Sequence, residues 1–401
     1  MGETVEGIER AAARLRASQA SILAAMPQAE IVTTLAEVAV RWRDPAYSLR
    51  GEADSLQEPF PFAMVKVSLD ALLDSLNPVA LWALIDSEGV RDAVGYPLIG
   101  HVIAANTPLL AWVSVIRALL VRSASLVKLP SGLAASWGRL LYRTLQDTAP
   151  ELAHCVHLVQ WSGGTADLDA ALCRSVDLVM AQGSDETICT LKAMCPINKP
   201  LVGYGHRVSF GVVPQGMSTM QAALGMACDV LLYDQGGCLS PQTIFVEGGW
   251  AETMDFAALL SEALAMVSVQ YPLPIRAERA AMTVREARLL ARMEAGNRLW
   301  EGPNLRWTVI ARTNSDFALS PTFGVISVQP LETLTQLPEV LSSVAGYLQG
   351  CAVAGEVKSY LPGISRLCAP GALQAPPLAW RQDGRDVLRV LLPPGYCDTR
   401  R

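Results

Sequence analysis

Cys238 directly follows two glycines in the segment YDQGGCLSPQ, residues 233–242. A nucleophilic cysteine needs a thiolate that faces a cleft and an approach path free of side chains. Gly236 and Gly237 would give such a path, and they also permit sharp backbone geometry. If a helix begins soon afterwards, the backbone N–H of Cys238 could help to hold a developing oxyanion. The alternative is a buried structural cysteine beside a Gly-Gly turn, since unpaired cysteines are among the most buried residues.

Two polar side chains stand at the ends of apolar runs in the first half of the chain. Asn106 lies in AANTP, where it could start a turn or a helix, or could aim its amide at the carbonyl oxygen of a bound acyl group. Lys128 lies in SLVKLPSG and is followed by Pro and by Ser131. This pair is well placed for the ribose or phosphate of a nucleotide, although a solvated Lys at a strand end is the commoner case.

Glycines mark two more candidate ligand contacts. Gly183 and Ser184 open GSDET, where a helix N-terminus could hold pyrophosphate, although the two acidic residues that follow would oppose its charge. Gly205 lies in GYGHR, where glycines at a strand end indicate close backbone approach to a ligand, or a bulge. Of the four histidines, only His206 lies in a segment whose residues indicate a function, GYGHR. The other three lie in apolar runs and are interpreted as core or surface residues. We expect no metal site, because HCVH at 154–157 has no further ligands nearby.

Alternating strand and helix patterns would position these residues. The apolar runs are 98–105, 125–129, 157–161, 177–182 and 200–204, and the helix-like segments between them are 109–122, 133–147, 167–175 and 184–194. This alternation is typical of a doubly wound parallel sheet, which binds ligands at the carboxyl ends of its strands. Two amphipathic helices, 4–25 and 29–42, precede it.

The second half of the chain predicts another α/β domain that opens at the cysteine. Its expected helices are 218–232, 254–270, 275–298 and 333–349, and its expected strands are 243–247, 307–312 and 323–329. We therefore divide the chain into an N-terminal helical segment, a nucleotide-binding domain, a catalytic domain and a wrapping tail, with the bounds 1–90, 91–208, 209–360 and 361–401.

Composition restricts the class of protein. Hydrophobic residues make up 51% of the 401 residues and charged residues only 17%, which fits a well-buried globule and excludes extensive disorder. A net charge of -6 argues against a nucleic-acid surface. Nine cysteines without CxxC spacing indicate free thiols in a reducing compartment, and no signal peptide is visible, so we expect a soluble cytoplasmic protein. The apolar stretch 97–121 carries polar residues that a lipid-facing span would not tolerate, which favours a buried strand, a turn and a buried helix.

The order of these motifs resembles the aldehyde dehydrogenase superfamily, which has an Asn-containing turn, a Lys-Pro-Ser strand end, a Gly-Ser helix start and a late catalytic cysteine. The segments LVGYGHRVSF, LYDQGGCLSPQ and GISRLCAPGALQAPPLAWRQDG resemble its LuxC-like acyl-CoA reductase branch, the fatty acid reductases of bioluminescent bacteria. The similarity runs from about residue 95 to about residue 390. It implies an aldehyde dehydrogenase-like α/β fold, with a Rossmann-type nucleotide domain and an α/β catalytic domain.

The resemblance assigns roles to six of the candidates. Cys238 would be the nucleophile, and Asn106 the side-chain half of the oxyanion hole. Lys128 and Ser131 would contact the adenosine ribose and its phosphate. Gly183 and Ser184 would face the pyrophosphate.

One departure from the superfamily pattern favours thioester reduction, and a second removes the usual contact to the nicotinamide ribose. Hydrolytic aldehyde dehydrogenases carry a Glu in the strand before the cysteine, whereas VGYGHR offers no carboxylate there, so a thioacyl-enzyme would meet a thiol or a hydride before water. The Glu that holds the nicotinamide ribose is also replaced, by SPTFG at 320–324. Ser131 stands where NAD-preferring relatives carry an acidic residue, which favours NADPH over NADH.

The predicted reaction is therefore NADPH-dependent reduction of an acyl-CoA or carrier-bound thioester to an aldehyde through a thioacyl-Cys238, with His206 as a candidate proton donor or thiol activator. An acyl-transferring partner protein and a homo-oligomer are expected by family analogy. The alternatives are a hydrolytic NAD(P)-dependent aldehyde dehydrogenase and a non-catalytic nucleotide-binding scaffold.

Overall fold

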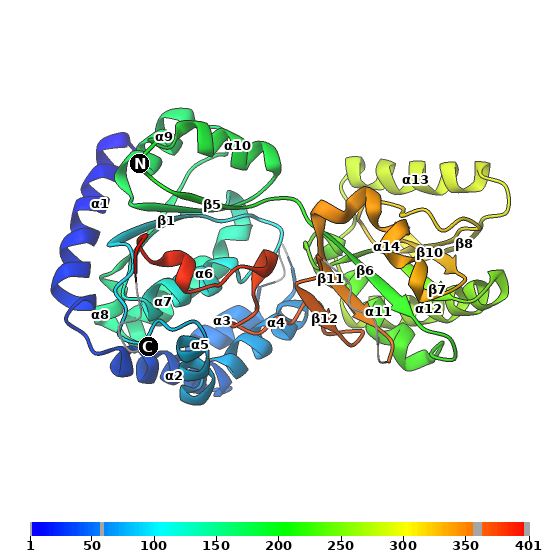
Figure 1. Ribbon diagram of the computed structural model, residues 1–401, viewed down its shortest axis with the longest axis horizontal. Helices are drawn as coiled ribbons and strands as arrows, with labels where there is room; N and C mark the ends of the chain where they lie inside the picture. Colours follow the sequence, from blue (N-terminus) through cyan, green and yellow to red (C-terminus); the bar gives the residue numbers. More distant parts are fainter. Residues whose placement is uncertain (1, 57–59, 356–362, 397–401) are drawn as a thin grey trace. The chain divides into compact units, whose positions relative to one another are not determined.

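The computed structural model describes residues 2–56, 60–355 and 363–396. The chain forms two compact units (Figure 1), the first made of residues 1–206 with 377–401 and the second of residues 207–376. The second unit is thus inserted into the first. The predicted boundary between nucleotide and catalytic domains, 208/209, lies two residues beyond this change of unit at 206/207.

A five-stranded parallel sheet forms the centre of the first unit. Its strand order is β3-β2-β1-β4-β5. The strands are β1 Leu98–Val102, β2 Ala124–Leu129, β3 Val156–Gln160, β4 Leu178–Gln182 and β5 Leu201–Tyr204. Every residue of β1 and β2 is buried, as expected for strands covered on both faces. The predicted doubly wound sheet is confirmed.

Helices cover both faces of this sheet (Figure 1), with α6 and α7 on one face and α1, α9 and α10 on the other. The helices are α1 Val5–Ser18, α2 Gln28–Arg43, α3 Ser48–Asp54, α4 Phe62–Ser75, α5 Pro78–Ser87, α6 Leu110–Leu120, α7 Ser136–Thr148, α8 Pro150–Ala153, α9 Ala166–Ser175 and α10 Asp185–Met194. A π-helical turn, Gln19–Leu23, extends α1.

The tail of the chain is fixed to the first unit by buried polar side chains. The guanidinium of Arg117 on α6 donates to the carbonyl oxygens of Leu378, at 3.2 and 2.7 Å, and of Trp380, at 3.1 Å. The Glu88 carboxylate, 4% exposed, accepts from the backbone N–H groups of residues 387–389 at 2.8 to 2.9 Å. These contacts explain why residues after 376 belong to the first unit.

A seven-stranded sheet forms the centre of the second unit, in the order β12-β11-β6-β7-β10-β9-β8. Only β8 is antiparallel to its neighbour. The strands are β6 Val208–Val213, β7 Pro241–Glu247, β8 Arg298–Glu301, β9 Thr308–Ala311, β10 Val325–Leu331, β11 Leu348–Val353 and β12 Arg366–Cys368.

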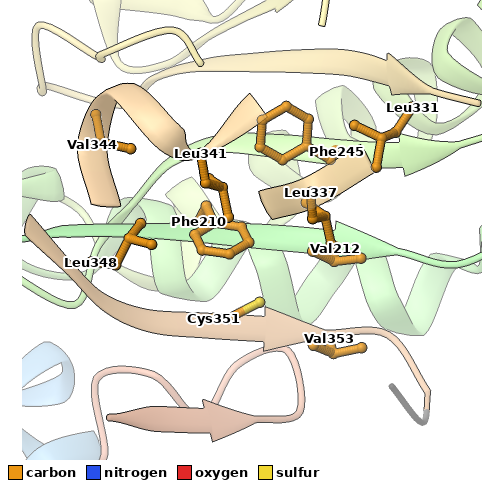
Figure 2. Packing of buried hydrophobic residues seen from close by; sticks show 10 residues of the cluster. All are labelled: Phe210, Val212, Phe245, Leu331, Leu337, Leu341, Val344, Leu348, Cys351 and Val353. Carbon is orange, nitrogen blue, oxygen red and sulfur yellow. The ribbon is translucent and has the colours of Figure 1, made fainter. Parts of the chain in front are cut away.

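The two faces of this sheet carry different helices. Helices α11 Met220–Leu231 and α12 Trp250–Gln270 pack on one face, whereas α13 Glu278–Met293 and α14 Leu337–Val340 lie on the other (Figure 1). Figure 2 shows the core under α14, where Phe210 of β6 and Phe245 of β7 lie with their ring centroids 6.2 Å apart beside Leu337 and Leu341. Burial of such side chains stabilises the fold by about 1.5–3 kcal/mol each.

Two predicted helices of the second unit are wrong in extent. The expected helix 333–349 is only one turn of α-helix, α14, followed by a 3₁₀ segment at Ser342–Tyr347 and by β11. The paired serines and Gly346 are poor helix formers, and LQGCAV is a buried strand. The expected helix 275–298 ends at Met293, because Gly296 takes a φ of 89° and turns the chain into β8.

Among the described residues, no single helix is long and apolar enough to cross a membrane; two strongly bent helix pairs reach the required length only when each pair is joined. The apolar stretch 97–121 forms β1, a turn and α6, as expected. Within β1, His101 is buried and its Nε2 lies 3.1 Å from Ser125 Oγ, which confirms it as a core residue.

Candidate active site

Lys128 lies at the carboxyl edge of the first sheet with an aromatic ring over its charge. It is the penultimate residue of β2 and only 8% exposed, and its Nζ lies 5.8 Å from the ring centroid of Trp161, just after β3. Burial lowers the pKa of Lys128, and the nearby Asp169 carboxylate opposes this shift. Asp169 in turn accepts from Trp161 Nε1 at 2.8 Å. The result is a fixed ammonium with an aromatic wall, suited to a ribose or a phosphate.

Ser131 lies just beyond β2, on the same edge, and is exposed. Its Oγ donates to the carbonyl oxygen of Trp161 at 3.4 Å. The chain after Ser131 first forms a 3₁₀ turn at Gly132–Ala135, and Ala135 occupies the N-cap of α7. The hydroxyl therefore belongs to the Lys128–Trp161 edge and not to the start of a helix.

Gly183 and Ser184 connect β4 to α10. Gly183 N–H donates to the Tyr204 carbonyl at 3.2 Å, and Ser184 is the N-cap of α10, with its Oγ accepting from Thr187 N–H at 3.2 Å. The helix N-terminus predicted from GSDET is confirmed, and its first N–H groups face the carboxyl edge of the sheet. Such groups can receive the negative charge of a pyrophosphate.

The carboxylate of Asp185 lies against the strand end at Gly205. From the sequence, Asp185 is only a charge that would oppose pyrophosphate. Asp185 Oδ1 accepts from His206 N–H at 2.8 Å, and a Cβ at position 205 would overlap this same oxygen. Glycine is thus needed at 205 to admit a carboxylate of this chain. The His206 side chain is exposed at the end of the first unit. A carboxylate therefore lies beside the end of β5 although β5 itself carries none, and no signal in the sequence indicated this fold-back.

Asn106 lies exposed between β1 and α6, four residues before the first residue of the helix. Strand β1 has β2 on one side and β4 on the other, so the chain order reverses beside it. Ligands of open parallel sheets bind at this reversal point. The structure therefore brings the turn of Asn106 and the α10 N-terminus of Gly183 and Ser184 to the two strands that flank this point.

Cys238 lies in the second unit, in a tight turn between α11 and β7. It is partly exposed and forms no disulfide. The turn is closed by Ser240 N–H donating to the Gly237 carbonyl at 2.9 Å, and Ser209 Oγ donates to the Cys238 carbonyl at 2.9 Å. A strand follows this turn, so the conditional expectation of a helix beginning after Cys238 is wrong. A role of the Cys238 N–H in stabilising an oxyanion therefore depends on the geometry of the turn and not on a helix N-terminus.

The two glycines before Cys238 have different environments. Gly236 is exposed, whereas Gly237 is buried, and a Cβ there would lie 3.1 Å from Oε1 of Gln374. Gln374 also donates to Ser240 Oγ at 2.8 Å. The access that Gly236 would give to the cysteine stays a prediction, whereas Gly237 accommodates the side chain of Gln374, which the local sequence does not reveal.

The segment that carries Gln374 is held by helix α11. Asp229, fully buried, accepts from the N–H groups of Gly371 at 2.7 Å and Leu373 at 3.0 Å. Burial raises the pKa of Asp229 to about 7, and the backbone donors oppose this rise. Gly225 allows the close approach, because a Cβ there would lie 2.5 Å from the Pro370 carbonyl carbon. In the sequence, this contact is indicated only by the presence of Asp229 and Gly225 in a largely apolar helix.

The described residues contain no cluster of three or more His, Cys, Asp or Glu side chains able to hold a metal ion, and every cysteine among them is a free thiol. The predicted cofactor contacts and Asn106 lie in the first unit, and Cys238 lies in the second. The residues present suit a nucleotide in the first unit, with an ammonium, a helix N-terminus and glycine backbone at one sheet edge.

A family model described as acyl-CoA reductase (LuxC) matches residues 23–391. The chain belongs to the LuxC acyl-CoA reductase family. The predicted resemblance is therefore confirmed, and the match extends further toward the N-terminus than the motifs had indicated.

Curated LuxC relatives match parts of the chain. The long-chain acyl-protein thioester reductase of Aliivibrio fischeri is 23% identical over 241 residues, 59% of this chain and 49% of the relative. That of Photorhabdus laumondii is 25% identical over 162 residues, 40% of this chain and 34% of the relative. The aligned segments thus span between a third and a half of these relatives.

Solved structures establish the fold. The NAD-dependent benzaldehyde dehydrogenase of Corynebacterium glutamicum matches with a TM-score of 0.73 and 16% identity, covering 98% of this chain and 89% of that one. The indole-3-acetaldehyde dehydrogenase of P. syringae, solved with NAD+, matches with a TM-score of 0.72 and 17% identity over 92% of this chain and 82% of that one. The predicted aldehyde dehydrogenase-like fold is confirmed.

Proposed function

We propose that the chain reduces an acyl thioester to an aldehyde with NADPH, through a thioacyl intermediate on Cys238. The family match over residues 23–391, which contains every proposed site residue, supports this most strongly. The partial exposure of Cys238 and the nucleotide-suited sheet edge agree with it. The proposed acyl donor is a thioester of CoA or of a carrier protein, and the curated relatives are named acyl-protein thioester reductases.

The chain's own residues would act as follows. The Cys238 thiolate attacks the thioester carbonyl, while the Asn106 amide and the Cys238 N–H stabilise the oxyanion, and the donor thiolate leaves. Lys128 and Ser131 hold the adenosine ribose and its phosphate, Gly183 and Ser184 border the pyrophosphate, and Gly205 is a further proposed cofactor contact. Bound NADPH supplies the hydride that reduces the thioacyl group to a thiohemiacetal. Collapse of this adduct releases the aldehyde and restores the thiolate.

His206 is proposed as the proton donor to the thiohemiacetal oxygen or as the group that favours the thiolate. Its exposed position at the end of the first unit leaves the imidazole accessible to solvent protons. An acyl-transferring partner protein, a homo-oligomer and a cytoplasmic location stay predictions from the sequence.

A single-turnover experiment tests the proposed reaction. The purified protein is mixed with acyl-CoAs of increasing chain length and NADPH, and nucleotide absorbance is followed while aldehyde is trapped. Cys238→Ala should lose all aldehyde formation. Cys228→Ala is the matched control, because Cys228 is another partly exposed cysteine of the same unit, whose pKa burial raises to about 11. Oxidation of aldehyde to free acid in water, with no thioester reduction, would instead support a hydrolytic aldehyde dehydrogenase.

A further inference from the structure

Three short segments of the second unit adopt left-handed backbone without glycine. Residues 233–235 have φ values of 56°, 53° and 61°, residues 304–305 have 52° and 60°, and residues 322–323 have 73° and 59°. Each such residue costs about 1–2 kcal/mol relative to ordinary backbone. This geometry persists only where surrounding contacts stabilise it. The first segment lies directly before the Cys238 turn.

One buried guanidinium contacts all three segments. Arg276, whose side chain is 6% exposed, forms an ion pair with the Asp234 carboxylate in the first segment. It also donates to the carbonyl oxygens of Leu305 at 3.1 Å, Arg306 at 3.1 Å and Phe323 at 2.8 Å. Its guanidinium carbon lies 5.3 Å from the Phe323 ring centroid. Arg276 thus stabilises the three strained turns together.

The first segment passes this constraint on to the cysteine. Gln235 Nε2 donates to the Pro241 carbonyl at 2.9 Å and to the Val325 carbonyl at 3.0 Å, and its Oε1 accepts from Ser320 Oγ at 3.2 Å. The Gln235–Pro241 contact closes the loop that contains Cys238. Phe323 N–H donates to the Asp234 carbonyl at 3.2 Å. Hydrogen bonds of the Gln235 side chain and of the Asp234 carbonyl therefore connect the cysteine loop to the 320–325 segment.

We propose that Arg276 is a positioning residue for Cys238. It holds Asp234 and, through the left-handed turn, Gln235, so that the loop of the thiol has one conformation relative to the 320–325 segment. This inference rests on the proposed role of Cys238 as nucleophile. A lysine cannot replace Arg276, because a single ammonium on a flexible stem does not reach acceptors on three separate segments.

Arg276→Lys tests this role, with Arg288→Lys as the matched control. Arg288 is similarly buried in the same unit and donates to Thr308 Oγ1 at 2.8 Å and to the Trp307 carbonyl at 3.0 Å, without contacting the segment 233–241. Arg276→Lys should lower the maximal single-turnover acylation rate of Cys238 by about 10- to 100-fold and leave the half-saturating thioester concentration within about twofold. Amide hydrogen exchange of a peptide covering 232–244 should accelerate at least about tenfold.

Arg288→Lys should change neither quantity by more than about twofold, even if it lowers thermal stability as much. Acylation and exchange at wild-type levels in Arg276→Lys would overturn the proposal. If the loop exchanges faster while even wild-type Cys238 accepts no acyl group, Arg276 holds the loop but the proposed function fails, and with it the role in positioning a nucleophile. Should Arg276→Lys not fold, Asp234→Asn removes the ion pairs of Asp234 with Arg276 and Arg306 and keeps a residue that tolerates left-handed backbone. It should give the same loop acceleration, and unchanged exchange would overturn the proposal.

Discussion

At the scale of single residues, the charge beside the proposed cofactor site is set by Lys128 and its neutral neighbour Ser131. Burial of Lys128 against Trp161 keeps its ammonium in one place, whereas Ser131 adds no charge. A cationic position whose neighbour at residue 131 carries no charge suits a 2′-phosphate. The proposed preference for NADPH therefore depends on the uncharged side chain of Ser131.

Ser131→Glu should lower kcat/KM for NADPH by about tenfold or more and leave kcat/KM for NADH nearly unchanged, because a carboxylate at this exposed position repels the 2′-phosphate. Steady-state kinetics with both nucleotides measure the ratio. Ser131→Gln is the isosteric control and should keep the wild-type preference. Equal losses for both nucleotides in Ser131→Glu would contradict the assignment.

The proposed oxyanion donor belongs to the same scale. Asn106→Ala should lower the single-turnover rate of Cys238 acylation by about 100- to 1,000-fold, since the developing oxyanion loses one hydrogen-bond donor. The neighbouring variant Thr107→Ala should stay within about threefold of the wild type. Acylation of Asn106→Ala at the wild-type rate would leave Asn106 as a simple turn residue, the alternative that its sequence context also allowed.

At the scale of secondary structure, helix α11 supports the cysteine turn through Asp229. This carboxylate is buried, and its pKa is raised from 3.8 to about 7 by loss of solvation. At a pH between these two pKa values, the folded state binds more protons than the unfolded state. Stability contributed by the protonated group is therefore lost as the pH rises from about 4 to about 7.

Asp229→Asn removes this titration. The free energy of unfolding of the wild type minus that of Asp229→Asn should fall by roughly 3 kcal/mol over that pH range, measured by urea unfolding. Asp255→Asn, at an exposed position on α12, is the control and should show no such slope. A wild-type minus Asp229→Asn difference that is constant across the range would show that Asp229 stays ionised in the folded protein.

Sequence patterns predicted elements well where burial is uniform along the segment. The five strands of the first sheet agree with apolar runs, because strands covered by helices on both faces must be apolar throughout. The strands β6 and β11 were missed. Segment VSFGVV at 208–213 follows GYGHR without a turn signal, and LQGCAV at 348–353 continues a helix-like apolar pattern. Short apolar runs of this kind fit a strand or a helix equally well, and only their partners in the sheet decide.

At the scale of the whole molecule, the chain leaves the first unit at residue 206 and returns to it at residue 377. The tail had been expected to wrap, but its attachment could not be derived from the sequence. The anchors are backbone groups of the tail bound by Glu88 and Arg117, and a carbonyl or N–H group carries no sequence signal. In the same way, the local sequence around Cys238 predicted a reactive turn but not Gln374 or Arg276, which reach it from distant segments.

Removing the main anchor tests this closure. Glu88→Ala leaves three backbone N–H groups at 387–389 without their acceptor, so the free energy of unfolding should fall by roughly 2–4 kcal/mol. Hydrogen exchange of these amides should accelerate, while peptides from residues 207–376 stay unchanged. Glu52→Ala, which removes only an exposed ion pair with Arg143, should cost about 0–1 kcal/mol. Protection of 387–389 at the wild-type level in Glu88→Ala would contradict the role of Glu88 as anchor.

The central claim is that Cys238 becomes acylated by a thioester. The most direct measurement is intact-protein mass spectrometry after mixing the protein with a long-chain acyl-CoA without nucleotide, followed by peptide mapping. We predict one added acyl group, located on Cys238, absent from Cys238→Ala and discharged as aldehyde when NADPH is added. A wild-type protein that remains unacylated with both CoA and carrier-protein thioesters, or an acyl group that maps to another cysteine, would contradict the account.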